Sequence, residues 1–90
     1  MNKAQFVDLL SQNTQMTKLE SEAFLDAAID IIQQTVAKGD EVKLVGFGTF
    51  SPLSKKARQG RNPKTGEPVQ IPGQTVPRFK PGKDFRQLLN

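Results

Sequence analysis

The sequence predicts an α+β fold, with helices in the first half of the chain and antiparallel strands in the second. Between residues 18 and 38 apolar side chains recur at spacings of three and four, which is the period of a helix face. At Val42 and Leu44, and again from Val69 to Phe79, apolar residues alternate with polar ones, between glycine- and proline-rich turn sequences. Ninety residues are enough for one domain and too few for two.

Two helices are predicted in residues 1–40. Asn2 can cap a short amphipathic helix whose apolar side chains begin at Phe6. Thr17 and Glu20 have the spacing of a capping box, and they open a longer helix from Lys18 to Lys38. Gly39 follows as a helix stop, since glycine readily takes the left-handed conformation found after a helix. The longer helix would measure roughly 30 Å at 1.5 Å per residue.

The longer helix is too widely apolar for one short partner to cover. One stripe along it joins Leu19, Ala23, Phe24, Ala27, Ala28 and Ile31, and a second runs beside it through Leu25, Ile29, Ile32 and Val36. A surface helix normally has a single stripe. A second copy of the chain is the simplest way to cover the other one, so the sequence predicts a homodimer.

The second half reads as strands joined by turns. Val42 and Leu44 alternate with a lysine before a glycine-flanked turn at residues 46–48, and a strand from Thr49 to Arg58 follows. Residues 62–66 have turn chemistry, with asparagine, proline and a glycine able to take positive φ. The return strand holds three prolines, which restricts it to a sheet edge or breaks it; these are Pro68, Pro72 and Pro77. Residues 83–89 suit a short helix presenting Phe85, Leu88 and Leu89.

The middle of this hairpin is too polar to enter a core. From about residue 54 to residue 70 only Ala57, Val69 and a few aliphatic stems can be buried. With about ten residues a side at roughly 3.3 Å each, the hairpin would project about 30 Å. An isolated two-stranded ribbon is marginal in water, so we expect this arm to be mobile until it meets a partner.

Charge is unevenly divided along the chain. Residues 1–50 carry four lysines and seven acids, a net −3, whereas residues 51–90 carry nine cations and two acids, a net +7. No acid occurs between residues 51 and 66. Such an imbalance is typical of nucleic-acid binding, and a solvated charged face is the plainer alternative.

Several other classes of function lack support. Without histidine, cysteine, tyrosine or tryptophan, the usual general base and zinc ligands are missing. Serine–lysine or paired-carboxylate chemistry stays possible in principle, but no acids cluster outside the helical half, so we expect no enzyme, metal site or cofactor. Glu22, Asp26 and Asp30, four residues apart, read as one solvated helix face. Residues 60–66 do not match a phosphate-binding loop, because the lysine precedes the second glycine and no helix follows. No apolar leader or membrane span is visible, so we expect a cytoplasmic protein.

Three phenylalanines leave two interpretations open. Phe47, Phe50 and Phe79 could stack on single-stranded bases, as in sheet-based RNA binders. Phenylalanines at alternating positions beside glycine turns more often fill a core, here one shared between subunits. We therefore predict a dimer core of Phe24, Ile31, Leu44, Phe47, Phe50 and Phe79.

The remaining constellation strongly resembles the HU/IHF family of bacterial DNA-bending proteins, HU most of all. The resemblance lies in the segments 46–50, GFGTF, and 60–67, GRNPKTGE, together with Lys55 and Arg58, and it extends from the first residues to Lys83. This family is itself a standard example of minor-groove architectural binding. It implies an intertwined dimer with a helical base, an antiparallel β saddle and two β-ribbon arms.

On that template the chain is one HU-like domain, residues 1–90. Residues 1–40 form the helical dimerisation part, residues 41–82 the saddle with an arm at about 54–74, and residues 83–90 a C-terminal helix. Pro63 at the arm tip resembles the apolar wedge that enters a base step from the minor groove, although it could simply shape the turn. The predicted DNA contacts are Lys3, Lys55, Lys56, Arg58, Arg61, Asn62, Pro63, Lys64, Arg78, Lys80, Lys83 and Arg86.

Leu53 departs from the pattern, since many relatives carry arginine there, and Lys56 and Arg78 are candidates to compensate. We expect a nucleoid-associated homodimer that binds, bends and compacts double-stranded DNA with little sequence preference. It should favour bent, nicked or junction forms of DNA. The minor groove offers only a degenerate base code, which suits weak selectivity. The alternatives are a sequence-specific subunit that needs a different partner chain, an RNA-binding sheet, and a protein-interaction module that never meets DNA.

Overall fold

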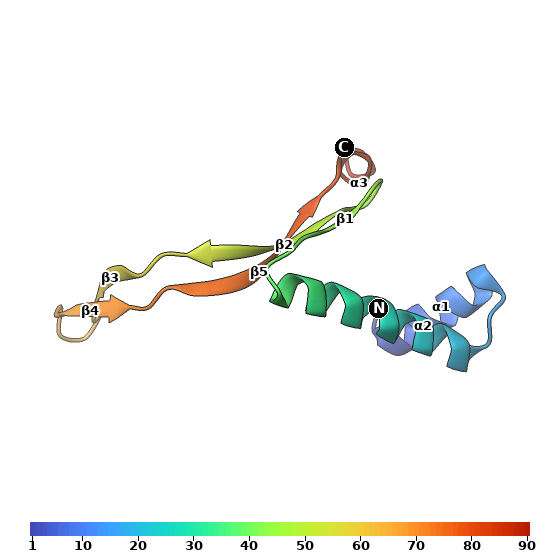
Figure 1. Ribbon diagram of the computed structural model, residues 1–90, viewed down its shortest axis with the longest axis horizontal. Coiled ribbons are helices and arrows are strands. Elements are labelled where there is room, and N and C mark those ends of the chain that lie inside the picture. The colour runs from blue at the N-terminus through green and yellow to red at the C-terminus, as the bar shows by residue number, and fades with distance from the viewer. The chain divides into compact units, whose positions relative to one another are not determined.

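The computed structural model describes residues 1–90, and the predicted α+β order of helices followed by strands is confirmed (Figure 1). The elements are α1 Lys3–Thr14, α2 Lys18–Ala37, β1 Val42–Leu44, β2 Gly48–Lys55, β3 Arg58–Arg61, β4 Pro68–Ile71, β5 Gln74–Pro81 and α3 Lys83–Gln87. None of the helices combines the length and apolarity needed to cross a bilayer. The chain divides into two compact units, residues 1–34 and residues 35–90.

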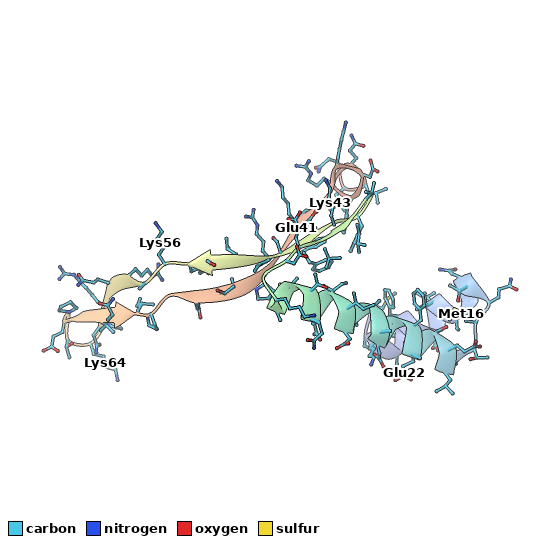
Figure 2. The ribbon with its side chains drawn as sticks, in the orientation of Figure 1. Met16, Glu22, Glu41, Lys43, Lys56 and Lys64 are labelled. Carbon is cyan, nitrogen blue, oxygen red and sulfur yellow. The ribbon has the colours of Figure 1, made fainter.

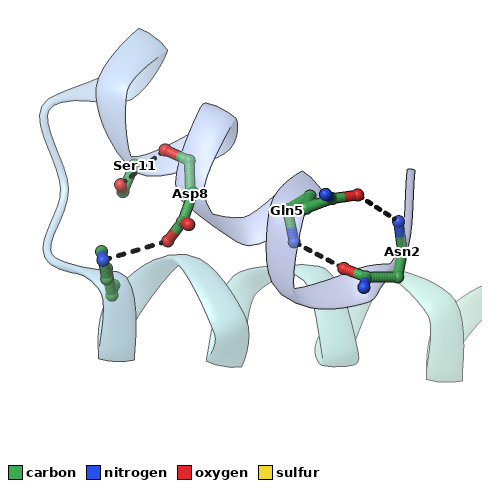
Figure 3. A network of polar contacts seen from close by, with 5 residues as sticks. Asn2, Gln5, Asp8 and Ser11 are labelled. Atoms are coloured by element: carbon green, nitrogen blue, oxygen red, sulfur yellow. Dashed lines mark hydrogen bonds and ion pairs between the residues drawn. The ribbon is translucent and has the colours of Figure 1, made fainter.

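The helices α1 and α2 both begin with reciprocal caps. The Asn2 Oδ1 atom accepts a hydrogen bond from the Gln5 amide, and the Asn2 amide donates to Gln5 Oε1, both at 2.9 Å (Figure 3). At the start of α2 the Glu20 amide donates to Thr17 Oγ1 and the Thr17 amide to Glu20 Oε1, each at 3.1 Å. These bonds satisfy amides that have no partner within the helix, which fixes where each helix starts.

The end of α2 follows from Gly39. This residue has φ of +90°, its amide donates to the Val36 carbonyl at 3.0 Å, and the Asp40 amide reaches back to the Thr35 carbonyl at 3.2 Å. This pair of bonds is a Schellman motif, with Lys38 as the residue that caps the helix. The helix therefore ends at Ala37, one residue before the position expected from the sequence.

A single chain buries very little in its helices. Val7 is the one buried apolar side chain, and Ser21 on α2 is fully buried. Phe24 and Ile31, which were predicted to lie in a core shared between two subunits, are 59% and 62% exposed in the single chain. Burying such side chains is the main source of folding free energy. The single chain leaves much of the apolar surface of its helices exposed, so it gains little of that free energy here.

In the second unit, three antiparallel strands form a sheet in the order β1-β2-β5, so β5 lies at an edge. Pro77 of β5 lies opposite Pro52 of β2. Pro52 is tolerated in this central strand because β1 pairs with β2 only as far as Phe50. The return path is also interrupted at Pro72 and Gly73, so the expectation that prolines would leave it at an edge or broken is confirmed.

Beyond this sheet the hairpin continues as a two-stranded ribbon of β3 and β4, closed by a turn at residues 62–67 (Figure 1). The single strand expected from Thr49 to Arg58 is therefore wrong, because pairing stops after Lys55 and resumes at Arg58.

The C-terminal helix is shorter than the predicted residues 83–89. It spans Lys83–Gln87, and the amides of Leu88 and Leu89 donate to carbonyls three residues back instead of four. Tightening of this kind is usual in the last turn of a helix. Both leucines are exposed in the single chain.

Candidate nucleic-acid interface

The pairing of the three-stranded sheet divides its side chains between two faces. Residues directly opposite each other share a face, and neighbours along a strand alternate. The alternation places Lys43 of β1, Lys55 of β2, and Arg78 and Lys80 of β5 on the same face. We call this the charged face.

The opposite face carries no charge. It presents Val42 and Leu44 from β1, Gly48, Phe50, Pro52 and Ser54 from β2, and Thr75, Pro77, Phe79 and Pro81 from β5. All charges of the sheet strands are positive and lie on one side of the sheet. Such a sheet has one side suited to a polyanion and the other suited to an apolar partner.

An aromatic cluster covers part of the uncharged face. Phe50 and Phe79 lie opposite each other with ring centroids 4.8 Å apart, and Phe47 contacts Phe79 at 5.1 Å. Phe85 of α3 stacks on Phe47 at 5.5 Å, with 15° between the ring planes. These rings contact one another, and the sheet pair Phe50 and Phe79 lies away from the cations, which favours the core interpretation over base stacking.

Sequence reasoning missed two members of these groups. Lys43 was not among the predicted DNA contacts, yet it lies on the charged face opposite Thr49. The alternation of Val42, Lys43 and Leu44 was the available signal, because the lysine must face away from its apolar neighbours. Phe85 was expected only on a short helix, and its place in the aromatic cluster depends on tertiary packing.

One feature of the charged face is apolar. Leu53 lies opposite Val76, between the pairs Ser51–Arg78 and Lys55–Gln74. Leu53 is 37% exposed. The structure therefore places an apolar pair where an arginine would extend the row of cations.

The arm carries its two arginines on different faces. Arg58 and Gly60 lie opposite Ile71 and Val69 on one face of the ribbon, and Arg61 lies on the other, opposite Pro68. The strands of the sheet and ribbon together hold six cations and no acid. Lys56 and Lys64 extend away from the ribbon backbone (Figure 2). A polyanion would therefore meet positive charge from either side of the arm.

The turn holds Pro63 at the tip of the arm. The Asn62 amide donates to the Glu67 carbonyl at 2.8 Å, and the Gly66 amide to the Asn62 carbonyl at 2.7 Å. The Asn62 side chain accepts from the Lys64 amide at 2.9 Å, and Gly66 has φ of +73°. None of these bonds uses Pro63, whose side chain is exposed. The turn thus presents a rigid apolar ring with no backbone donor of its own.

Among the predicted DNA-binding cations, only Lys3 forms an ion pair. Its Nζ lies 2.7 Å from Asp26 Oδ1 and 4.0 Å from Glu22 Oε1. The hydrogen bond to Asp26, and then its charge, raise the pKa of Lys3. The acidic helix face of Glu22 and Asp26, which was expected to be only solvated, thus forms ion pairs with Lys3, one of the predicted DNA contacts. Lys3 would have to leave Asp26 to bind a phosphate. The cations of the second unit make no ion pair.

Comparison with known proteins agrees with this geometry. All of residues 1–90 match the family described as Bacterial DNA-binding protein. The chain is 43% identical over 90 residues to DNA-binding protein HU of Clostridium pasteurianum, covering 100% of this chain and 99% of the relative. It is 47% identical over 89 residues to DNA-binding protein HU of Nostoc sp. strain PCC 7120, covering 99% of this chain and 95% of the relative.

Solved structures give the same answer. The Anabaena HU–DNA cocrystal structure AHU2 matches with a TM-score of 0.91 and 46% identity, covering 99% of this chain and 97% of that one. HU from Thermotoga maritima matches with a TM-score of 0.72 and 27% identity over the full length of both chains. The chain belongs to the HU family of bacterial DNA-binding proteins, which are architectural proteins and not enzymes.

Proposed function

We propose that the protein is a homodimer that binds double-stranded DNA through the charged face and the arms, bends it, and compacts the nucleoid. The observation that carries this proposal is the two-sided sheet, with every cation of its strands on one face and aromatic side chains on the other. A polyanion neutralises the first face, and a second subunit covers the second.

Dimer formation is supported by the apolar surface left open in one chain. Phe24, Ile31, Leu44 and Phe47 are all more than 40% exposed. Isolated exposed apolar side chains are ordinary, but many of them on a chain with almost no buried core indicate a partner. In this arrangement residues 1–40 supply most of the dimer contacts, and residues 54–74 form the arm.

DNA bending is assigned to Pro63. A wedge has to be apolar, stiff and exposed, and Pro63 has these properties at the end of a cationic ribbon. Inserting such a wedge costs a few kcal/mol of base unstacking, and the bend then brings more DNA backbone against the protein. The remaining contacts are the arm residues Lys55, Lys56, Arg58, Arg61, Asn62 and Lys64, and the flanking residues Lys3, Arg78, Lys80, Lys83 and Arg86.

Selectivity should be low, because the arm carries cations and little else that reads base edges. Affinity then comes mainly from phosphate contacts, and log K falls with log salt by about 0.9 per phosphate neutralised. The direct test is binding to linear, nicked and four-way-junction DNA of the same length at two salt concentrations. Steep salt dependence with tighter binding to the nicked and junction forms is expected, and a flat salt response would contradict the proposal.

The alternatives give different results in the same experiments. A sequence-specific subunit would discriminate strongly between random and selected DNA and would need a second chain to form its dimer, which size-exclusion chromatography of the purified protein detects. An RNA-binding sheet would prefer single strands. A protein-interaction module would give no shift of DNA even at low salt.

A further inference from the structure

The hydrogen bonds that flank the hairpin determine which residue pairs of each ladder are bonded. In an antiparallel ladder, hydrogen-bonded and non-hydrogen-bonded pairs alternate. The Gly82 amide donates to the Phe47 carbonyl at 2.8 Å, so residues 47 and 82 form a bonded pair. Counting by twos along the register of β2 and β5 makes Lys55–Gln74 a bonded pair and leaves Pro52–Pro77 unbonded. Proline has no N–H, so both prolines fit there without losing a bond.

The ribbon of β3 and β4 follows the opposite alternation. Its turn contains the bond from the Asn62 amide to the Glu67 carbonyl, at 2.8 Å. Counting by twos from that pair makes Gly60–Val69 and Arg58–Ile71 bonded pairs. Pro68, opposite Arg61, falls in an unbonded pair, where its missing N–H again costs nothing.

The alternation of bonded and unbonded pairs, which we call the phase of a ladder, is therefore shifted by one residue between the two ladders. A regular ladder would follow Lys55–Gln74 with a bonded pair at residues 57 and 72, and later with one at residues 61 and 68. Pro72 and Pro68 cannot donate in those pairs. Pairing instead stops after Lys55–Gln74, leaves two residues unpaired on each strand, and resumes at Arg58–Ile71. From there on, bonded and unbonded positions are exchanged relative to a regular ladder.

Gly73 allows the strands to stay close at this break. A Cβ at residue 73 would lie 2.9 Å from the Lys55 carbonyl oxygen and 3.1 Å from the Ala57 nitrogen. Pro72 thus removes the donor that would continue the ladder, and the next residue lets the backbones approach. The break therefore lies at the sequence Pro72-Gly73 of the return strand.

The exchange of phase decides where the arm's first arginine lies. In an antiparallel pair of L-residues, the side chains of all bonded pairs project on one face, because the same chirality orients N–H and Cβ at each of them. Arg58 therefore lies on the same face as Lys55. A hollow of about 340 Å³ fits this assignment, since it is lined by Lys55, Lys56, Arg58, Ile71, Pro72 and Gln74.

We propose that Pro72 and Pro68 are positioning residues for DNA binding, which hold the ribbon in the exchanged phase so that Lys55 and Arg58 together grip one DNA backbone phosphate in this hollow. The inference rests on the proposed function. The hollow has three cations and no acid on its lining, and the apolar surface of Ile71 and Pro72 suits the adjoining deoxyribose. In the continuous phase, Arg58 would project from the opposite face and the hollow would lose one of its walls.

The phase itself is measured on the free protein by NMR. Unbonded pairs have Cα atoms about 4.5 Å apart and bonded pairs about 5.5 Å, so only unbonded pairs give strong cross-strand contacts between α-protons. The wild-type protein should show the contact between Gln59 and Gln70. In the variant Pro68→Val/Pro72→Val, it should be replaced by a contact between Arg58 and Ile71.

Pro77→Val is the matched control, because residue 77 is unbonded and its new amide would point away from β2. This variant should keep the Gln59–Gln70 contact. If the double valine variant also keeps it, or if the wild-type protein lacks it, the prolines do not set the phase and the proposal is overturned.

DNA binding at one fixed salt concentration tests the shared phosphate. Lys55→Ala and Arg58→Ala should each weaken binding, and the two together should weaken it by clearly less than the product of the single effects, because both act on one phosphate. In the Pro68→Val/Pro72→Val background the two effects should multiply. Multiplying effects in the wild-type background would overturn the shared grip. If the wild-type protein bound no DNA, the proposed function would fail while the NMR result on the phase stood.

Discussion

Phe50 lies directly opposite Phe79 on the uncharged face, and their ring centroids are 4.8 Å apart. Phe79 is still 36% exposed in the single chain. A tilted aromatic pair stabilises a fold by more than the apolar area that it buries. Within one subunit, however, only part of the surface of this pair is covered. We therefore predict that the pair belongs to a core that a second subunit completes.

Phe79→Ala should destabilise the dimer by about 3 kcal/mol, the lower range for a phenylalanine removed from a core. Urea unfolding at several protein concentrations measures this, because the midpoint of a folded dimer rises with concentration. Leu53→Ala on the charged face is the control and should cost much less. Equal losses in the two variants, or a midpoint independent of concentration, would contradict a core shared between subunits.

Local chemistry made much of the fold predictable from the sequence. Asn2, Thr17 and Gly39 act on backbone groups within a few residues of themselves, so the starts of α1 and α2 and the end of α2 were readable to within a residue. The hairpin turn was readable for the same reason, since Asn62 and Gly66 bond within the turn.

Features that depend on residues far apart in the sequence were not predictable. The break after Lys55 lies opposite Pro72 and Gly73, and this relationship appears only once the strand register is known. The ion pair of Lys3 with Asp26 joins two helices whose packing no spacing rule supplies. For the site, the cationic character of the hairpin was clear, but the face on which each cation lies required the pairing.

Ser21 is fully buried on α2, and its Oγ has no hydrogen-bond partner. A buried hydroxyl without a partner costs on the order of 1 kcal/mol or more, and alanine also favours the helix. Ser21→Ala should therefore raise the free energy of unfolding by about 1 kcal/mol, measured by urea unfolding at fixed protein concentration. Ser11→Ala is the control, because the Ser11 hydroxyl donates to the Asp8 carbonyl at 2.8 Å and its loss should bring no gain. A destabilised Ser21→Ala variant would show that the hydroxyl finds a partner in the dimer.

Glu20 makes the stability of α2 depend on pH. Hydrogen bonds from the Thr17 amide and then the Thr17 hydroxyl lower the pKa of Glu20 below its ordinary value of 4.5. A carboxyl whose pKa is lowered on folding stabilises the folded state above its unfolded pKa, and that stabilisation is lost as the pH falls through the folded pKa. The midpoint of urea unfolding should therefore fall below about pH 4.5, and this fall should be smaller in Glu20→Gln, whose amide oxygen still accepts the bond. Identical slopes in the two proteins would remove Glu20 from the acid response.

If Lys3 contacts DNA as proposed, Asp26 would compete with DNA for it, since the Lys3 Nζ lies 2.7 Å from the Asp26 carboxylate. Asp26→Asn should leave stability almost unchanged, since exposed ion pairs contribute little. It should tighten DNA binding and steepen its salt dependence, because Lys3 becomes free to neutralise a phosphate. Asp8→Asn, which frees Lys18 from its pair at 3.1 Å, is the control and should leave DNA binding less affected. If Asp26→Asn binds DNA as the wild-type protein does, Lys3 is not a DNA contact.

Pro63 should separate bending from binding. Its ring is exposed at the arm tip, and the hydrogen bonds that hold the turn are made by its neighbours, so Pro63→Ala should keep the turn and the dimer. On the proposed mechanism most of the affinity comes from phosphate contacts that this change leaves in place, whereas the wedge that unstacks the base step and kinks the duplex is lost. Energy transfer between dyes at the two ends of a short duplex should therefore report a smaller bend at saturating protein, with affinity reduced only severalfold. Pro77→Ala, on the uncharged face of the sheet, should bend DNA as the wild-type protein does. If Pro63→Ala gave the wild-type energy transfer, the bend would have to arise from wrapping along the cations alone, and Pro63 would serve only to shape the turn.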